Sequence, residues 1–519
     1  MDIQTVLRNM LSHHETKISG QLSFKPGQIF YGTVQKLFPN QHAEIQVGAH
    51  KMMAKLEVPL VSGNGYWLQV TSGEVETRLK LLTSGTDSVL KDNGTQVLLK
   101  QLSLPDDKKN QVLARFLMNE QIPLSKEEMR RASQFLKQTG DIDGALNTIK
   151  LMKEKQMPMN EEVFRSLMTV GKESSTNQLI QSLQTALTSE SEISSSGKEI
   201  LTLLNSWQKE SLTQRGHQLF REILQATGEQ SAPAQKMIMQ SLLQKLNISS
   251  GSIDQRIIEL AIQKLGLYAK FMQSGTEVVH FPNELQSFVQ SLSVAEKEAI
   301  QQLVATAEKQ YKGEAALQQL KQSLQRTGLF YEGEIFQERS RDILESLKPL
   351  LVKYVQETSS TAVNGSRDNA EQLLMRFNGQ QLLSFENGPV QQILYEIPIQ
   401  LGKYQTELTM QWEGKRTSDG QIDPDFCRII FYLELEHLKE TVVEMQVQNR
   451  VVTVNIINES PGIKSIAESL VPTLKTGLEQ MKYQLSAVHF KQPETNIKQP
   501  TKKGYYQSQH SYTGVDIRI

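Results

Sequence analysis

The chain has 519 residues and is nearly neutral, with 56 Lys and Arg against 57 Asp and Glu and a formal net charge of -1. A chain of this length has room for about three domains of roughly 100 to 200 residues each, so a single core is not expected. Because no long block of one charge is visible, the counterion release that drives nucleic-acid binding has no obvious source. We therefore expect no nucleic-acid partner.

The N-terminal stretch MDIQTVLRNMLSHHETKISG lacks the continuous apolar core of a cleaved secretory signal. No run approaches the ~20 apolar residues that a membrane span needs. The one cysteine, Cys427, excludes an internal disulfide and is compatible with a reducing compartment. We expect a cytoplasmic protein without membrane insertion, unless a route without a cleaved signal exports it, and interpret residues 1–20 as an N-terminal helical or export-type segment.

A small β domain is predicted for residues 21–85. The runs GQIFYGTVQKLF, HAEIQVGAHKMMAKL and GYWLQVTSGEVETRLKLL are rich in β-branched and aromatic residues and are separated by glycine-containing turns. Either a small barrel or a meander fits this pattern.

Residues 86–356 form the predicted helical region, where apolar residues recur with a period of 3.6. The segment SVAEKEAIQQLVATAEKQY opens with Ser293 and Glu296 at the spacing of a capping box. Two segments of this region, QIPLSKEEMRRASQFL and QMPMNEEVFRSLM, place Pro123 and Pro158 35 positions apart. That period suits helical-repeat proteins that read single-stranded RNA, but such arrays usually need at least three units and no clear third copy is present. Two packed helix pairs with similar caps are therefore the favoured explanation.

No motif for chemistry emerges from the chain. None of the nine histidines lies in H-E-x-x-H or at i, i+4 spacing, and no nucleophile elbow, phosphate-binding loop or dinucleotide fingerprint is present. We therefore expect a protein that is not an enzyme, with no catalytic residue, no metal ligand and no cofactor.

A last domain is predicted for residues 370–491, after a linker at 357–369. A short helix is followed by the alternating runs VQQILYEIPIQLG, YQTELTMQWEG and CRIIFYLELE, then by a hairpin through Thr441 to Ile456. The segment GIKSIAESLVPTLKTGLEQMKYQL, kinked at Pro472, is predicted to cover the sheet, and QLSAVHF to close it. Its predicted covering stripe consists of Ile466, Leu470, Leu474, Leu478, Met481 and Leu485.

The predicted fold class is multidomain α+β. It combines a small N-terminal β domain, a long and mainly helical middle, and a C-terminal α+β domain with a mixed sheet and one or two covering helices. Residues 492–519 are predicted to be a flexible tail with a terminal apolar strand.

The order of elements in the last domain resembles the C-terminal domain of the flagellar hook-length control protein family, of which this chain would be a divergent, Gram-positive-type member. The matching pattern is a strand with alternating leucines (Leu433, Leu435), a leucine-containing loop, two strands joined by a hairpin, the helix LVPTLKTGLEQMKYQL and a closing strand.

The resemblance implies a regulator of the flagellar type III secretion apparatus. Members of the family switch export from hook to filament subunits, and their C-terminal domain contacts the cytoplasmic domain of an export-gate membrane protein. The implied partner here is that domain or its soluble homologue, and the implied route out of the cell needs no cleaved signal.

The sequence departs from the family in the loop linked to switching. The family reads Pro-x-Leu-Gly, whereas the corresponding residues here are Glu436, His437, Leu438 and Lys439, so only Leu438 matches. The last residues of the family also matter for switching. We therefore predict partner-binding residues at Leu438, Val515, Ile517 and Ile519, with the last three acting as an added edge strand.

Two alternatives stay open beside this interpretation. One is a cytoplasmic interaction scaffold of the same family without a flagellar role. The other is a helical-repeat RNA-binding protein built on the two segments that begin near Pro123 and Pro158.

Overall fold

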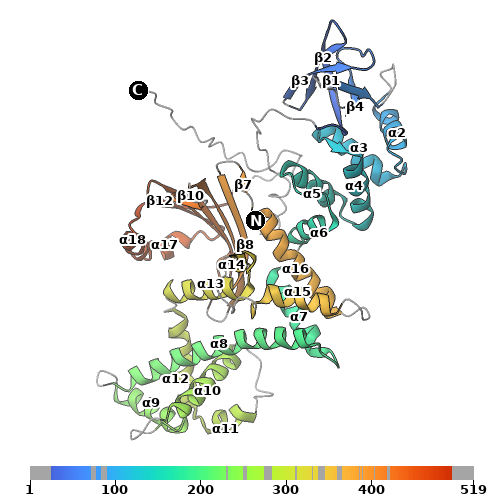
Figure 1. The fold of residues 1–519 in the computed structure, drawn as a ribbon. Helices are drawn as coiled ribbons and strands as arrows, with labels where there is room; N and C mark the ends of the chain where they lie inside the picture. Colours follow the sequence, from blue (N-terminus) through green and yellow to red (C-terminus); the bar gives the residue numbers. More distant parts are fainter. Residues whose placement is uncertain are drawn as a thin grey trace. The chain divides into compact units, whose positions relative to one another are not determined.

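The computed structural model describes residues 25–493, apart from 49, 72–77, 83–89, 173, 229–231, 249–253, 274–282, 310–312, 330, 337–344, 359–364, 385, 388–389, 402–403 and 418–420 (Figure 1). The chain divides into two compact units. The first is built from residues up to Glu173 together with Asn378–Leu383, and the second from Ser174–Phe377 and Ser384–Gln492.

The first unit begins with a closed five-stranded barrel. Strand β1 pairs with both β2 and β4, β2 pairs with β3, and β5 pairs with β3 and β4, so the ring has no open side. The β3–β5 pair is parallel and the others are antiparallel. The strands are β1 Gln28–Phe38, β2 His42–Val47, β3 His50–Leu56, β4 Gly65–Thr71 and β5 Arg78–Leu81.

Period-2 alternation explains the barrel interior. In β2, the buried Ala43, Ile45 and Val47 alternate with residues that keep contact with solvent. Phe30 and Leu68, from β1 and β4, are fully buried in the same core. Of the two architectures that fit the sequence, the structure is therefore the barrel.

Short capped helices complete the first unit. Ser125 and Glu128 form a capping box at the start of α4, and the side chains of Asp107 and Asn160 cap α3 and α6. The elements are α2 Leu90–Gln101, α3 Lys108–Glu120, β6 Leu124–Ser125, α4 Lys126–Gln138, α5 Ile142–Glu154 and α6 Glu161–Val170. Phe135 and Phe164 stack at a ring-centroid distance of 4.4 Å, which packs α4 against α6.

The second unit contains a long run of helices, which pack around two cores. One core joins the C-terminal half of α8 to α9, α10, α11 and α12, and the other joins α7, the N-terminal half of α8, α15, α16 and strand β8. The helices are α7 Thr176–Ser189, α8 Ser195–Ala226, α9 Pro233–Lys245, α10 Gln255–Gln273, α11 Asn283–Ser291, α12 Val294–Lys309, α13 Gly313–Thr327, α14 Tyr331–Phe336, α15 Leu347–Glu357 and α16 Gly365–Leu383.

The predicted capping box at the start of α12 is confirmed. The Ser293 backbone N–H donates to Glu296, and the Glu296 N–H donates to Ser293 Oγ. Glu296 is buried, which raises its pKa, but hydrogen bonds from Lys245, Ser241 and Ser293 outweigh burial and lower the pKa to about 2. The cap therefore also fastens α9 to α12.

The C-terminal sheet has seven strands in sequence order, β7 to β13. All neighbouring pairs are antiparallel except β12 and β13, which the crossover through α17 and α18 makes parallel. The elements are β7 Glu386–Asn387, β8 Val390–Leu401, β9 Tyr404–Arg416, β10 Ile422–Leu435, β11 Lys439–Gln448, β12 Val451–Asn458, α17 Ile463–Glu468, α18 Val471–Gln480 and β13 Gln484–Lys491. A mixed sheet with helices confirms the predicted α+β class.

The predicted covering stripe is wrong. Two short helices stand where one kinked helix was expected, and each buries a single apolar residue, Ile463 in α17 and Leu478 in α18. Leu485 belongs to β13. The interruption between the two helices lies at Ser469 and Leu470. The other four stripe residues, Ile466, Leu470, Leu474 and Met481, are exposed.

Upstream helices bury the first long strand instead. Tyr395 and Ile397 of β8 lie in the same core as Leu179 of α7 and Phe377 of α16. The helix α16 begins at Gly365, within the range predicted as a linker. The domain bounds drawn from the sequence stay a prediction, but residue contacts group this sheet with the helices that follow Glu173.

Candidate interaction surfaces

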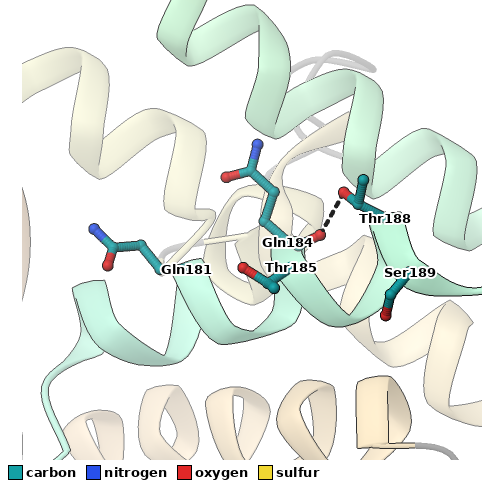
Figure 2. A pocket seen from close by; sticks show the side chains of 5 residues that line it. All are labelled: Gln181, Gln184, Thr185, Thr188 and Ser189. Atoms are coloured by element: carbon teal, nitrogen blue, oxygen red, sulfur yellow. Dashed lines mark hydrogen bonds between the residues drawn. The ribbon is translucent and has the colours of Figure 1, made fainter. Parts of the chain in front are cut away.

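A hollow of about 610 Å³ on α7 is lined by hydroxyl and amide side chains (Figure 2). Thr188 Oγ1 donates to the Gln184 carbonyl within the helix at 2.7 Å, and the Gln184 side chain donates to Asn205 at 3.0 Å. The lining residues are Gln181, Gln184, Thr185, Thr188 and Ser189. The hollow therefore offers neutral hydrogen-bonding groups but no carboxylate, imidazole or thiol for acid–base chemistry.

Among the residues that the structure describes, no group of three or more His, Cys, Asp or Glu side chains could hold a metal ion. Within the same ranges, no helix combines the length and apolar character needed to cross a membrane.

A buried ion pair fixes the start of the C-terminal sheet. Arg376 of α16 and Glu396 of β8 are both fully buried, and the guanidinium meets the carboxylate through two hydrogen bonds, Nε to Oε2 at 2.6 Å and Nη2 to Oε1 at 2.8 Å. Thr176 Oγ1, at the start of α7, donates to the same Oε2 at 2.8 Å. Burial alone would lower the pKa of Arg376, but the Glu396 carboxylate outweighs it and raises the pKa.

A second carboxyl group lies beside this pair. Glu407 of β9 accepts a hydrogen bond from the Asn177 backbone N–H at 3.1 Å, and the Asn177 side chain donates to the Thr406 carbonyl at 2.6 Å. Part of Glu407 reaches solvent, but burial of its carboxyl group and the charge of Glu396 raise its pKa to about 8. The protonated form is thus favoured near neutral pH, which avoids adding an uncompensated negative charge beside the ion pair.

These groups act as a structural clamp. Their polar atoms form hydrogen bonds with one another that join the helices α7 and α16 to the strands β8 and β9. They therefore hold helices on strands instead of facing a substrate. The sequence carries one signal for this clamp, a lone glutamate among the apolar residues of ILYEIPI. Its arginine partner lies 20 positions earlier on a helix, and that pairing cannot be deduced from spacing.

Leu438, a residue predicted to bind a partner, lies in the turn between β10 and β11. Leu435 pairs with Lys439 across the turn, and the Leu438 side chain is partly exposed. The buried Asn458 of β12 fastens the turn, because its side-chain amide donates to the carbonyls of Leu438 at 2.7 Å and Glu440 at 2.9 Å. The loop is therefore a tight turn held by a side chain from the neighbouring strand.

The backbone of this turn is left-handed at one residue. Lys439, which directly follows Leu438, adopts a conformation with φ 55°. Glycine enters that region without steric cost, whereas a side chain with a Cβ does not. The other predicted docking residues, Val515, Ile517 and Ile519, lie outside the described residues.

A further surface covers the outside of the barrel, on the three strands β1, β2 and β3. Between β2 and β3, the outward positions pair as His42 with Lys55, Glu44 with Met53 and Gln46 with Lys51. The Lys51 ammonium contacts the Glu44 carboxylate at 3.1 Å, and the Met53 residue is 53% exposed.

Strand β1 adds an aromatic ring to this surface. Phe38 pairs with His42 at the end of β1 and is 43% exposed, and the exposed Lys36 pairs with Glu44. An exposed ring beside several lysines is the combination that lets a protein stack a base and attract a phosphate. Sequence reasoning missed this surface because the charges of the whole chain cancel.

Comparisons with known proteins agree with the barrel. Residues 6–80 match the family described as TP0910 S1-like domain. Over 585 aligned positions, covering 100% of this chain and 99% of the relative, the chain is 22% identical to "Uncharacterized protein YlqG" of Bacillus subtilis (strain 168). No solved structure matches. The N-terminal β domain is thus similar to an S1-like domain, and the similarity to the relative extends over the whole chain.

The left-handed residue in the β10–β11 turn yields a test of the turn geometry. We expect Lys439→Gly to raise the free energy of unfolding by about 0.5 to 1 kcal/mol, because glycine removes the steric cost of φ 55°. The measurement is urea unfolding of the full chain. Glu440→Gly is the matched control, because residue 440 lies in β11 and a glycine there should lower stability. Lower stability of Lys439→Gly would contradict the turn described.

Proposed function

We propose that this chain is a non-enzymatic, cytoplasmic regulator of flagellar type III export, similar to hook-length control proteins. Its C-terminal sheet would bind the cytoplasmic domain of an export-gate membrane protein or the soluble homologue of that domain. The observation that carries the proposal is the order β10, tight turn, β11, β12, two short helices and β13. The family resemblance rests on the same order of elements, with one helix at the place of the two short helices.

The geometry of the turn supports the same proposal. The family uses glycine after the leucine of its switching loop, and Lys439 supplies the left-handed backbone that glycine would adopt there. The hydrogen bonds from Asn458 hold the Leu438 carbonyl in place before any partner arrives. A preformed turn loses little conformational entropy on binding, which favours its use as a docking element.

Binding of the purified partner domain tests the proposal. We expect the full chain to bind the purified cytoplasmic domain of the export-gate protein in a calorimetric titration. Leu438→Asp should weaken this binding at least about tenfold, because a carboxylate would be desolvated in the contact. Met237→Asp is the control, since Met237 lies on α9 and is 70% exposed, and this variant should bind like the unaltered chain.

Two outcomes would overturn this assignment. One is absence of heat or complex formation with the unaltered chain at concentrations of both proteins near 100 µM. The other is an equal loss of binding in both variants. Deletion of the gene with unchanged hook lengths and motility would favour the scaffold without a flagellar role. The terminal residues Val515, Ile517 and Ile519 remain a proposed second contact.

A second candidate function rests on the barrel. We propose that it binds single-stranded nucleic acid on the surface formed by β1, β2 and β3, contrary to the expectation from net charge. Support comes from the likeness to an S1-like domain and from the exposed Phe38 beside Lys36 and Lys55. In five-stranded barrels of the OB type, the face of strands 2 and 3 binds oligonucleotides.

Fluorescence anisotropy with a labelled single-stranded oligoribonucleotide tests this second function. We expect Phe38→Ala to weaken binding by about 1 to 3 kcal/mol through loss of stacking, and affinity to fall as salt rises. Leu37→Ala is the matched control, because Leu37 is similarly exposed but alternates to the other side of β1. Absence of binding at low salt would exclude a nucleic-acid role for the barrel.

A further inference from the structure

The helices α17 and α18 carry an apolar surface that the described part of the chain leaves exposed. Leu470 is 63% exposed, Ile466 62%, Met481 61% and Leu474 40%. Figure 1 shows the two helices beside β12. Each helix buries one apolar residue, Ile463 in α17 and Leu478 in α18. Large apolar side chains grouped in this way mark a surface that binds another protein.

The charges along these helices are self-complementary. Lys464 pairs with Glu468 at 3.7 Å and Lys475 with Glu479 at 4.0 Å, and all four side chains are exposed. The midpoint of this series lies between Val471 and Pro472. A two-fold axis at the midpoint would place Lys464 opposite Glu479 of a second copy and Glu468 opposite Lys475. A parallel arrangement would instead oppose like charges.

A glycine inside α18 points to the same partner. Gly477 lies in the body of the helix, where glycine weakens helical structure, and a Cβ added there would meet no atom within 4 Å. Among the described residues of the chain, no close approach therefore calls for glycine at this position. The same two-fold axis places Gly477 opposite Ile466 of the second copy, where absence of a side chain leaves room for the exposed isoleucine.

We propose that α17 and α18 form an isologous interface with a second copy of this chain. Leu470 and Leu474 lie near the two-fold axis and pack against their counterparts, Ile466 fits over Gly477, and the two ion pairs re-form between copies at the rim. The arrangement is an antiparallel helix pair with an apolar centre and a charged edge. This interface is independent of the docking turn at Leu438.

Charge exchange tests the interface in the full chain. Sedimentation equilibrium should give twice the chain mass of 58.7 kDa for the unaltered protein at micromolar concentration. The double variant Lys464→Glu with Glu468→Lys keeps the ion pair within α17 but opposes like charges between copies. It should raise the dimer dissociation constant roughly tenfold or more. Adding Lys475→Glu and Glu479→Lys should restore the dimer, because all four facing pairs become attractive again.

A substitution at the glycine provides the second variant. Gly477→Gln should stabilise α18, since glutamine is the better helix former, while its side chain occupies the space of Ile466 and prevents dimerisation. A monomeric unaltered protein at 100 µM would overturn the proposal. So would a dimer that survives both the double charge exchange and Gly477→Gln, because another surface would then hold it. Failure of the quadruple variant to restore the dimer would contradict the antiparallel pairing.

Discussion

The buried pair of Arg376 and Glu396 is the interaction on which the second unit depends most. Both side chains are withdrawn completely from solvent, and their two hydrogen bonds join α16 to β8. Removing one partner from such a pair leaves a buried charge uncompensated and costs about 3 to 5 kcal/mol. Thr176 adds the start of α7 to the same carboxylate. These hydrogen bonds fix strand β8 of the sheet to helices that precede it in the sequence.

The packing of these helices on β8 determines which parts of the sheet remain available for binding. Helices cover β8, which shares a core with α7 and α16, whereas the strands from β10 onward pack mainly among themselves and against Leu478 of α18. The β10–β11 turn and the outer faces of α17 and α18 stay available for partners. The β8 end of the sheet is therefore fixed by the buried ion pair and the helix core. The part of the sheet from β10 onward carries the β10–β11 turn and the helices α17 and α18, to which we assign binding.

Local patterns in the sequence predicted local structure well. The alternation in the strands, the capping box of Ser293 and Glu296 and the turn at Leu438 all depend on neighbours within a few residues, and all are present. The sequence could not decide between a closed barrel and a meander, because closure depends on the β3–β5 pair, whose strands are not connected by a tight turn.

Structural features that depend on residues far apart in the sequence could not be predicted. The prediction of a covering stripe was wrong because apolar spacing indicates only that side chains share one face of a helix. It does not indicate whether that face packs against the sheet. Leu470 and Leu474 thus look like core residues in the sequence and are exposed in the structure. The barrel surface with Phe38 was not predicted because the net charge of the whole chain does not reveal a local group of lysines. Nothing in the sequence indicated the left-handed backbone of Lys439.

The central claim is that the helices α7 and α16 and the strands β8 and β9 form one cooperative unit around the buried ion pair. Hydrogen exchange of the Arg376→Met variant tests it most directly. The account predicts that amide protection falls together in α7, α16, β8 and β9, with the barrel strands unaffected, because the uncompensated Glu396 weakens every element that surrounds it. Loss of protection confined to α16, with β8 and β9 unchanged, would contradict the claim.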